Sequence, residues 1–254
     1  MLQTLFNIFT TMSALPAYAE LHCLSNFTFV RGASHAEELV TRAQALGYGA
    51  LAITDECSLA GVVRAHVAAR QHGFKLIIGT EVQIDDGPKL VLLATNRESY
   101  GHISMLITRA RRRAVKGSYR LTLADLEQNL DHCLALLIPG QQPDSEHANY
   151  LARRFPQRAW IAVELLNGPN DHAQLEALRE LSAQSGLPLV ASGDVHMHLR
   201  SRKPLQDTLT AIRHGVTLAA AGHRLQPNAE RHLRARGARA HLSARAAGRN
   251  TAHR

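Results

Sequence analysis

Short apolar runs alternate with amphipathic segments along most of this chain, and that alternation limits the folds open to it. The apolar runs have the length and composition of strands, and they cover residues 19–25, 49–55, 75–84, 89–96, 133–139, 159–166 and 187–194. Most of them are followed by a segment with helical spacing. Nearly continuous apolar strands between such helices favour a parallel sheet covered on both faces. The fold class is therefore α/β, as a barrel or as a doubly wound sheet.

The helical segments show their own start signals. Ser34 with Glu37, and Thr122 with Asp125, match the capping-box pattern that begins a helix. Further helices are expected near residues 99–115, 145–155 and 171–185. One more helix follows residue 55, and its spacing predicts a single apolar face made of Leu59, Val62, Val63, Val67 and Ala68.

Acidic residues recur where the apolar runs end, at Asp55, Glu81, Glu164 and Asp194. In a barrel, the carboxyl ends of the parallel strands converge on one face, where active sites lie. In an open sheet they would spread along an edge. The repeated polar strand ends therefore favour the barrel, and we expect His22 and these four acids to meet on one face.

The last apolar run ends in "LVASGDVHMH", residues 189–198. Asp194 and His196 are two residues apart, so their side chains point the same way in an extended segment. This arrangement suits two ligands of one metal ion, but from the residues alone a solvated or hydrogen-bonded Asp and His at a strand end is the first interpretation. Imidazole and carboxylate groups together suit zinc or manganese.

The charge of the chain is concentrated at its end. The formal net charge is +8, but residues 231–254 hold seven arginines and no acid, which leaves 22 basic and 21 acidic residues elsewhere. The Ala/Arg-rich tail, residues 234–254, is expected to be disordered, so its removal should barely change the melting temperature. A basic arm that binds nucleic acid is the alternative.

Other features point to a cytoplasmic protein. The three cysteines are odd in number and far apart, which indicates a reducing compartment without disulfides. Residues 1–15 form an N-terminal extension, and the following "AYA" lacks the positive region of a signal peptide. No apolar run approaches the length that a membrane span needs.

A family resemblance rests on several stretches taken together in order. They include "YAELHCLSNFTFVRGASHAEELV", "GYGALAITDECSLAGVVRAHVAAR", "KLIIGTEV", "LPLVASGDVHMH" and "RKPLQDTLTAIRHG". Over roughly residues 16–232, the chain resembles the PHP (polymerase and histidinol phosphatase) domain of bacterial C-family DNA polymerase alpha-type subunits, in the error-prone, damage-inducible branch. The resemblance implies a distorted seven-stranded (β/α) barrel over residues 16–200. Residues 201–233 would then begin, as helix, the connection to a polymerase region that is not part of this chain. The Arg/Ala-rich end after about Leu233 departs from the family pattern, and whether that end is truncated or frameshifted stays open.

The resemblance also implies a cluster of divalent ions held by histidines and carboxylates, and here the ligand set is partial. The matching residues are His22, Glu81, Asp194 and His196, with Asp55 and Glu56 as further candidates. The family's other ligand positions hold Leu24, Arg31, Lys89 and Gly140. We therefore expect a remnant site that binds at most one zinc or manganese ion, which would raise thermal stability and support little turnover.

The resemblance implies DNA and other replication or repair proteins as partners, and magnesium as the metal of the full-length polymerase. Our leading hypothesis is a PHP module without a polymerase centre, and no residue is assigned a catalytic role. An active metal-dependent phosphoesterase or 3′–5′ exonuclease, and a non-enzymatic interaction module with a basic tail, stay open. Four arginines could contact DNA phosphates or satisfy a helix end: Arg109, Arg111, Arg112 and Arg113.

Overall fold

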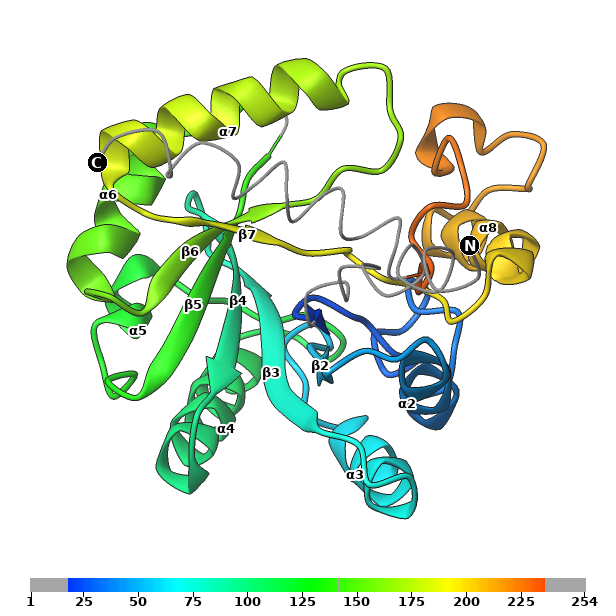
Figure 1. Ribbon diagram of the computed structural model, residues 1–254, viewed down its shortest axis with the longest axis horizontal. Helices are drawn as coiled ribbons and strands as arrows, with labels where there is room; N and C mark the ends of the chain where they lie inside the picture. The colour runs from blue at the N-terminus through cyan, green and yellow to red at the C-terminus, as the bar shows by residue number, and fades with distance from the viewer. Residues whose placement is uncertain (1–17, 141, 236–254) are drawn as a thin grey trace, which may run out of the picture.

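The computed structural model describes residues 18–140 and 142–235, which form a seven-stranded, nearly closed barrel (Figure 1). The strands follow one another around the barrel in sequence order. They are β1 (Ala19–Glu20), β2 (Ala50–Ile53), β3 (Leu76–Gln83), β4 (Lys89–Ala94), β5 (Cys133–Ile138), β6 (Ala159–Val163) and β7 (Leu189–Ala191). Beyond β1 and β7, Cys23 and Val195 form a parallel bridge that brings the first and last strands together. The predicted distorted seven-stranded barrel is confirmed.

Helices surround the barrel (Figure 1). They are α2 (Ala36–Ala45), α3 (Val62–Gln71), α4 (Arg97–Arg112), α5 (Leu123–Leu126), α6 (Ser145–Arg154), α7 (Asp171–Ser185) and α8 (Lys203–Arg213), with 3-10 turns η1 (Arg200–Arg202) and η2 (Gly222–Arg224). The expected helices at 99–115, 145–155 and 171–185 correspond to α4, α6 and α7. Within residues 18–140 and 142–235, no helix is long and apolar enough to cross a membrane.

One strand runs against the predicted parallel sheet. β4 pairs antiparallel with both β3 and β5, whereas the other neighbouring strands pair parallel. Residues 84–88 join β3 to β4, and this connection is too short for the crossover that a parallel pair requires. The expectation of an all-parallel sheet was therefore wrong at β4, and the start of β4 lies beside the end of β3.

Two local predictions about α2 and α3 were also wrong. The N-cap residue of α2 is His35 and not Ser34. The backbone N–H of His35 donates to Glu38 Oε2 at 2.8 Å. In α3, Val63 and Val67 are 71% and 52% exposed. The buried face is made instead of Val62, Ala65, Ala68 and Ala69. Small alanine side chains let α3 approach α2 and β3 closely. The size of the side chains therefore determined which face of α3 is buried more than their hydrophobicity did.

The predicted capping box before α5 is confirmed, since the Thr122 backbone N–H donates to Asp125 Oδ2 at 2.9 Å. The first strand is shorter than the predicted 19–25, because only Ala19–Glu20 pair continuously with β2.

The end of the described chain returns to the barrel after α8. The backbone N–H of His196 donates to Arg231 O at 2.9 Å, and Met197 and His232 form a bridge. Arg234 is buried, and its guanidinium donates to Leu165 O at 2.9 Å, so the tail expected from residue 234 is packed at that residue. The remaining predictions for residues 236–254, and those for residues 1–15, lie outside the described residues.

Candidate functional site

Polar side chains from four strand ends meet at the carboxyl end of the barrel. The Nε2 atom of His22 lies 2.8 Å from Glu81 Oε2 and 3.8 Å from Asp194 Oδ1. Its Nδ1 atom lies 2.7 Å from Glu164 Oε1. His22, Glu81 and Asp194 each offer a ligand atom, and these atoms lie within 4.8 Å of one another. The predicted convergence of these four side chains is confirmed.

Asp55, the fifth residue expected on this face, turns its carboxylate toward an adjacent turn. It accepts hydrogen bonds from the Ser25 backbone N–H (2.8 Å), the Ser25 hydroxyl (2.7 Å) and the Thr28 hydroxyl (2.7 Å). Burial raises the pKa of Asp55, and these hydrogen bonds offset part of that rise. Asp55 therefore holds the segment that leads to Arg31 and contributes no oxygen to the cluster around His22.

His22 is fully buried between two carboxylates. Burial alone would lower its pKa, but the carboxylates of Glu164 and Glu81 outweigh burial and raise the pKa. A neutral imidazole has one donor and one acceptor, so it can donate to only one of the two acids. The imidazolium donates to both, which is the protonation state that the geometry favours.

Glu81 is the centre of the cluster and is surrounded by cations. Arg31 Nη1 lies 2.5 Å from Glu81 Oε1 and 2.5 Å from Glu56 Oε2. Lys89 Nζ lies 2.9 Å from Glu81 Oε2. Burial by itself raises the pKa of Glu81, but the hydrogen bond from His22 and the charges of Lys89 and Arg31 hold it well below its usual range. Glu81 is therefore an ionised carboxylate, and both of its oxygens are paired with cations.

The antiparallel direction of β4 explains how Lys89 reaches this cluster. Lys89 is the first residue of β4 and pairs with Gln83, the last residue of β3. Glu81 and Lys89 are diagonal neighbours on the same face of adjacent strands, within reach of a long side chain. In a parallel β4, the amino end of the strand would lie at the opposite end of the barrel.

Asp194 and His196 lie together as predicted, and two further residues complete their surroundings. His196 Nε2 lies 3.0 Å from Asp194 Oδ1, and the Gln206 amide donates to His196 Nδ1 at 3.1 Å. Arg231 forms an ion pair with the other oxygen of Asp194. Burial, followed by the charge of Arg31, holds the pKa of His196 well below its usual range. His196 is thus a neutral imidazole that donates to Asp194.

A polar cavity of about 480 Å³ opens beside this cluster. Arg31, Glu81, Lys89, Asp194 and Arg231 line its floor, and residues of α8 and the segment after it form its outer wall. Sequence reasoning missed Arg231 and Gln206. The only signal for Arg231 was its place in an arginine-rich stretch, and nothing marked it out from the arginines around it.

A family model described as "PHP domain" matches residues 20–168, which is more than half of the chain. The chain belongs to the PHP domain family. Curated relatives named "Error-prone DNA polymerase" match this PHP chain over most of its length. The protein of Dechloromonas aromatica is 59% identical over 228 residues, which is 88% of this chain and 22% of the relative. That of Pseudomonas aeruginosa is 56% identical over 87% of this chain and 21% of the relative. The chain therefore spans about a fifth of these relatives.

Solved structures show the same fold at low sequence identity. A protein from Bifidobacterium adolescentis described as a metal-dependent phosphoesterase superposes with a TM-score of 0.51 and 16% identity, covering 71% of this chain and 88% of that one. An amidohydrolase from Chromobacterium violaceum gives a TM-score of 0.50 with 17% identity and the same coverages. At this level of identity the likeness concerns the fold of the PHP barrel.

The four positions at which ligands were expected to be missing lie in different surroundings. Arg31 and Lys89 point into the cluster and bind Glu81. Leu24 is fully buried in the core and Gly140 is exposed at the barrel rim. Two of the four positions thus hold a cation that pairs with Glu81, and the loss of metal ligands at these positions stays a prediction.

The arginines at the end of α4 mostly have partners within the protein. Arg111 donates to the carbonyl oxygens of Cys57 (3.2 Å) and Glu56 (3.1 Å), so it fixes the loop that carries Glu56. Arg109 donates to Gln128 and Arg113 pairs with Asp125. Arg112 is exposed. A contact of these residues with DNA stays a prediction, and Arg112 is the side chain best placed for it.

Proposed function

We propose that this chain is the PHP module of an error-prone DNA polymerase, which serves DNA synthesis past damage and DNA repair as a scaffold and not as a hydrolase. Support comes from the identity of up to 59% to relatives with that name. Polymerase chemistry needs carboxylates that hold two metal ions. We assign that chemistry, with its magnesium and its contacts to DNA, to the part of such a protein that lies beyond this chain.

The observation that carries the proposal is the ion-pair network around Glu81. Arg31 and Lys89 contact its two oxygens, and His22 donates to it from the inner side. With Arg231, these cations face four carboxylates of the site, namely Glu56, Glu81, Glu164 and Asp194. The charges balance without a metal ion. Protein cations therefore take over the structural role that divalent ions have in a ligand-complete PHP site.

The donor set fits one divalent ion at most. His22, Glu81 and Asp194 stand close enough to share an ion, but a ligating imidazole nitrogen must be deprotonated. Binding would require His22 to lose a proton and Arg31 or Lys89 to give up Glu81. An ion held there would supply Lewis acidity, and imidazole with carboxylate suits zinc or manganese. The neighbouring cations would oppose it by like-charge repulsion.

A metal-dependent phosphoesterase is the second candidate, because the His22, Glu81 and Asp194 cluster borders a cavity large enough for a phosphoester. Hydrolysis of nitrophenyl phosphoesters and of single-stranded DNA across a series of manganese, zinc and magnesium separates the two candidates. We expect weak or no turnover relative to an Asp194→Ala variant, and negligible primer extension. Robust hydrolysis that disappears in Asp194→Ala would overturn the scaffold proposal in favour of the phosphoesterase.

A further inference from the structure

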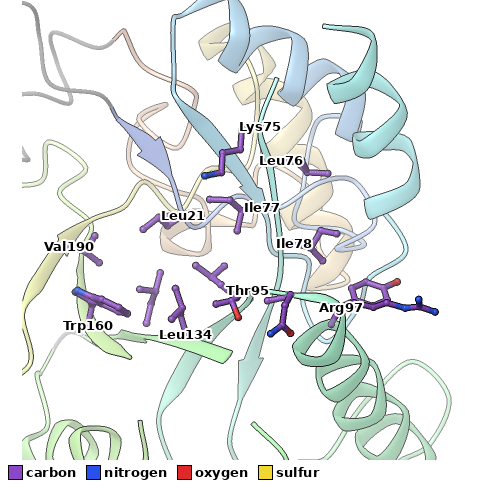
Figure 2. Close-up of a pocket in the computed structure, with 15 residues that line it drawn as sticks. Leu21, Lys75, Leu76, Ile77, Ile78, Thr95, Arg97, Leu134, Trp160 and Val190 are labelled. Atoms are coloured by element: carbon purple, nitrogen blue, oxygen red, sulfur yellow. The ribbon is translucent and has the colours of Figure 1, made fainter. Parts of the chain in front are cut away.

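The end of the barrel opposite the polar cluster, its amino end, holds an apolar cavity of about 790 Å³. Figure 2 shows Leu21, Leu134 and Trp160 pointing into this cavity from different parts of the sheet. Lys75 and Arg97 stand at its rim. The cavity belongs to the barrel itself, because the strands supply its walls. Another apolar surface lies outside the barrel, on a helix that turns its apolar side outward.

That helix is α8, which buries polar groups and exposes large apolar ones. Gln206 and Ala211 are its buried residues, and the Gln206 amide donates to the polar cluster. Leu205 and Ile212 are 41% and 60% exposed. Leu205, Leu209 and Ile212 recur at helical spacing and form one stripe along α8. Because a helix of a globular protein normally buries its apolar stripe, this stripe marks a surface that another polypeptide covers.

The stripe borders a groove of about 320 Å³ between α8 and the turn at residues 26–32. Leu205 and Leu209 line the groove from α8, and Phe29 and Val30 line it from the turn. The Phe29 side chain is 77% exposed, which is a large aromatic surface to leave in water. We call the stripe and the groove together the α8 face, which consists of Phe29, Val30, Leu205, Leu209 and Ile212.

The α8 face is joined to the polar cluster by the two segments that form it. Val30 has a φ of 57°, in the left-handed region that a β-branched residue rarely adopts. That conformation places Val30 at the groove while Arg31, the next residue, pairs with Glu81. Gln206 makes the corresponding inward contact from α8. Such a strained turn persists only when its surroundings hold it, and a polypeptide on the α8 face would hold it from the outer side.

The length of the curated relatives points to the polypeptide that covers this face. The protein of Dechloromonas aromatica is 59% identical to this chain and aligns with 88% of it, a share that includes α8. This chain nevertheless covers 22% of that relative. In a protein of that length, the remaining polypeptide is covalently linked to the module. Its effective concentration at the α8 face is then far above that of a free partner.

We propose that the α8 face docks an apolar surface of the polymerase region, and that docking fixes the turn that carries Arg31. This inference rests on the proposed function, since it takes the chain to be a module of a longer polymerase. Phe29 and Ile212 are the anchors, because they are the most exposed apolar side chains of the face. Arg213, exposed at the end of α8, selects an acidic residue at the edge of the docked surface.

The test compares this chain alone with a full-length hybrid, in which residues 1–233 replace the aligned segment of the Dechloromonas aromatica protein. Primer extension by the hybrid confirms that its polymerase region is folded. Hydrogen exchange of α8 and of residues 26–32 is measured in both proteins. We expect exchange of both segments to be slower in the hybrid by a factor on the order of ten or more.

Two variants and a matched control identify the face. In the hybrid, Ile212→Asp and Phe29→Asp should return the exchange of α8 to the rate of the chain alone. Neither variant should change the melting temperature of the chain alone, because both side chains are exposed there. Val63→Asp is the control, since Val63 is 71% exposed on α3, and it should leave the slow exchange of the hybrid intact.

Three outcomes would overturn the proposal. The first is equal exchange of α8 in the chain alone and in the hybrid. The second is slow exchange in the hybrid that both variants leave intact or that Val63→Asp also abolishes. The third is exchange in the chain alone that slows as protein concentration rises, which would make a second copy the occupant. The hydrolysis assay tests the proposed function separately, because none of the exchange measurements depends on turnover.

Discussion

The two ends of the barrel are built from the same strands and are held together by opposite kinds of interaction. At the carboxyl end, buried charges pair at hydrogen-bond distance around Glu81 and His22. At the amino end, partly buried apolar side chains surround an open cavity. Removing one partner of a buried ion pair leaves the other charge buried and unpaired. Apolar contacts have no preferred direction, and the stability that they contribute is proportional to the apolar area that they bury.

This difference shows how a barrel can exchange the chemistry of one end without losing its fold. The residues inside the barrel, such as Ala52, Val91 and Leu136, form a continuous apolar layer between the two ends. Side chains at the strand ends can therefore change from ligands to cations while the layer stays intact. The stability of the carboxyl end then depends on each buried charge having a partner of opposite charge, and variants that remove one partner test this.

The largest expected effect is that of Glu81→Gln. The change leaves Arg31, Lys89 and the His22 imidazolium without their shared carboxylate in a buried site. Removing one partner of a buried ion pair costs about 3–5 kcal/mol. The free energy of unfolding from urea titration measures the loss. Glu98→Gln is the control, because that carboxylate is 63% exposed and lies 3.7 Å from His132. A similar small loss in both variants would mean that the network does not hold the carboxyl end.

The apolar end is tested by two leucines of β5. Leu136 is 2% exposed in the inner layer, and Leu134 lies one step nearer the cavity on the same strand face. Leu136→Ala should cost about 2–5 kcal/mol, because the cavity it leaves cannot be filled. Leu134→Ala should cost less, because its surroundings at the cavity wall can relax. Chemical unfolding of both variants checks the order, and a larger loss for Leu134→Ala would reverse the contrast that we draw within the barrel.

The fold could be predicted largely from sequence, because strand runs and helix spacing depend on local patterns. All seven strands lie within the predicted runs. The direction of β4 was missed because an apolar run reads the same in both directions, and only the short connection at residues 84–88 distinguishes them. The buried face of α3 was missed because alanines pack closely there while Val63 and Val67 face solvent.

The site could be predicted less completely, since it depends on contacts between distant segments. Strand-end position identified His22, Glu81 and Asp194, and comparison with the family's motifs pointed to Arg31 and Lys89. Arg231 reaches Asp194 only because the segment after α8 folds back onto the barrel. No local pattern encodes that return, so Arg231 could not be assigned to the site from the sequence.

A third prediction concerns pH and only the carboxyl end. The pKa of His22 is raised in the folded state, so its stabilising contribution is full below the unfolded pKa of about 6.5 and is lost as pH rises through the folded pKa. The pKa of His196 is lowered, so its contribution changes in the opposite direction. The difference in free energy of unfolding between the wild type and His22→Asn isolates the first effect. We expect it to shrink above pH 6.5 by at most about 1.4 kcal/mol per pH unit. A pH-independent difference would show that His22 is neutral.

The smallest expected effect is that of metal ions on the wild type. A ligand that binds only the folded state stabilises it by about 0.4 kcal/mol when its concentration equals Kd. Because the donors of His22 and Glu81 are already paired, manganese or zinc at moderate concentration should raise the melting temperature only slightly.

Replacing the two cations tests the reason for that small effect. The double variant Arg31→Glu and Lys89→His removes the charges that hold Glu81 and supplies two donors of the type that divalent ions prefer. It should be less stable than the wild type without metal and should gain more in melting temperature when manganese or zinc is added. Arg120→Glu is the control, since Arg120 is 69% exposed and pairs with Asp85 away from the cluster. If the wild type gained as much from metal as the double variant, the cations would not be what excludes the ions. The carboxyl end would then be a metal site, and Arg31 and Lys89 would pair with Glu81 only when no metal ion is bound.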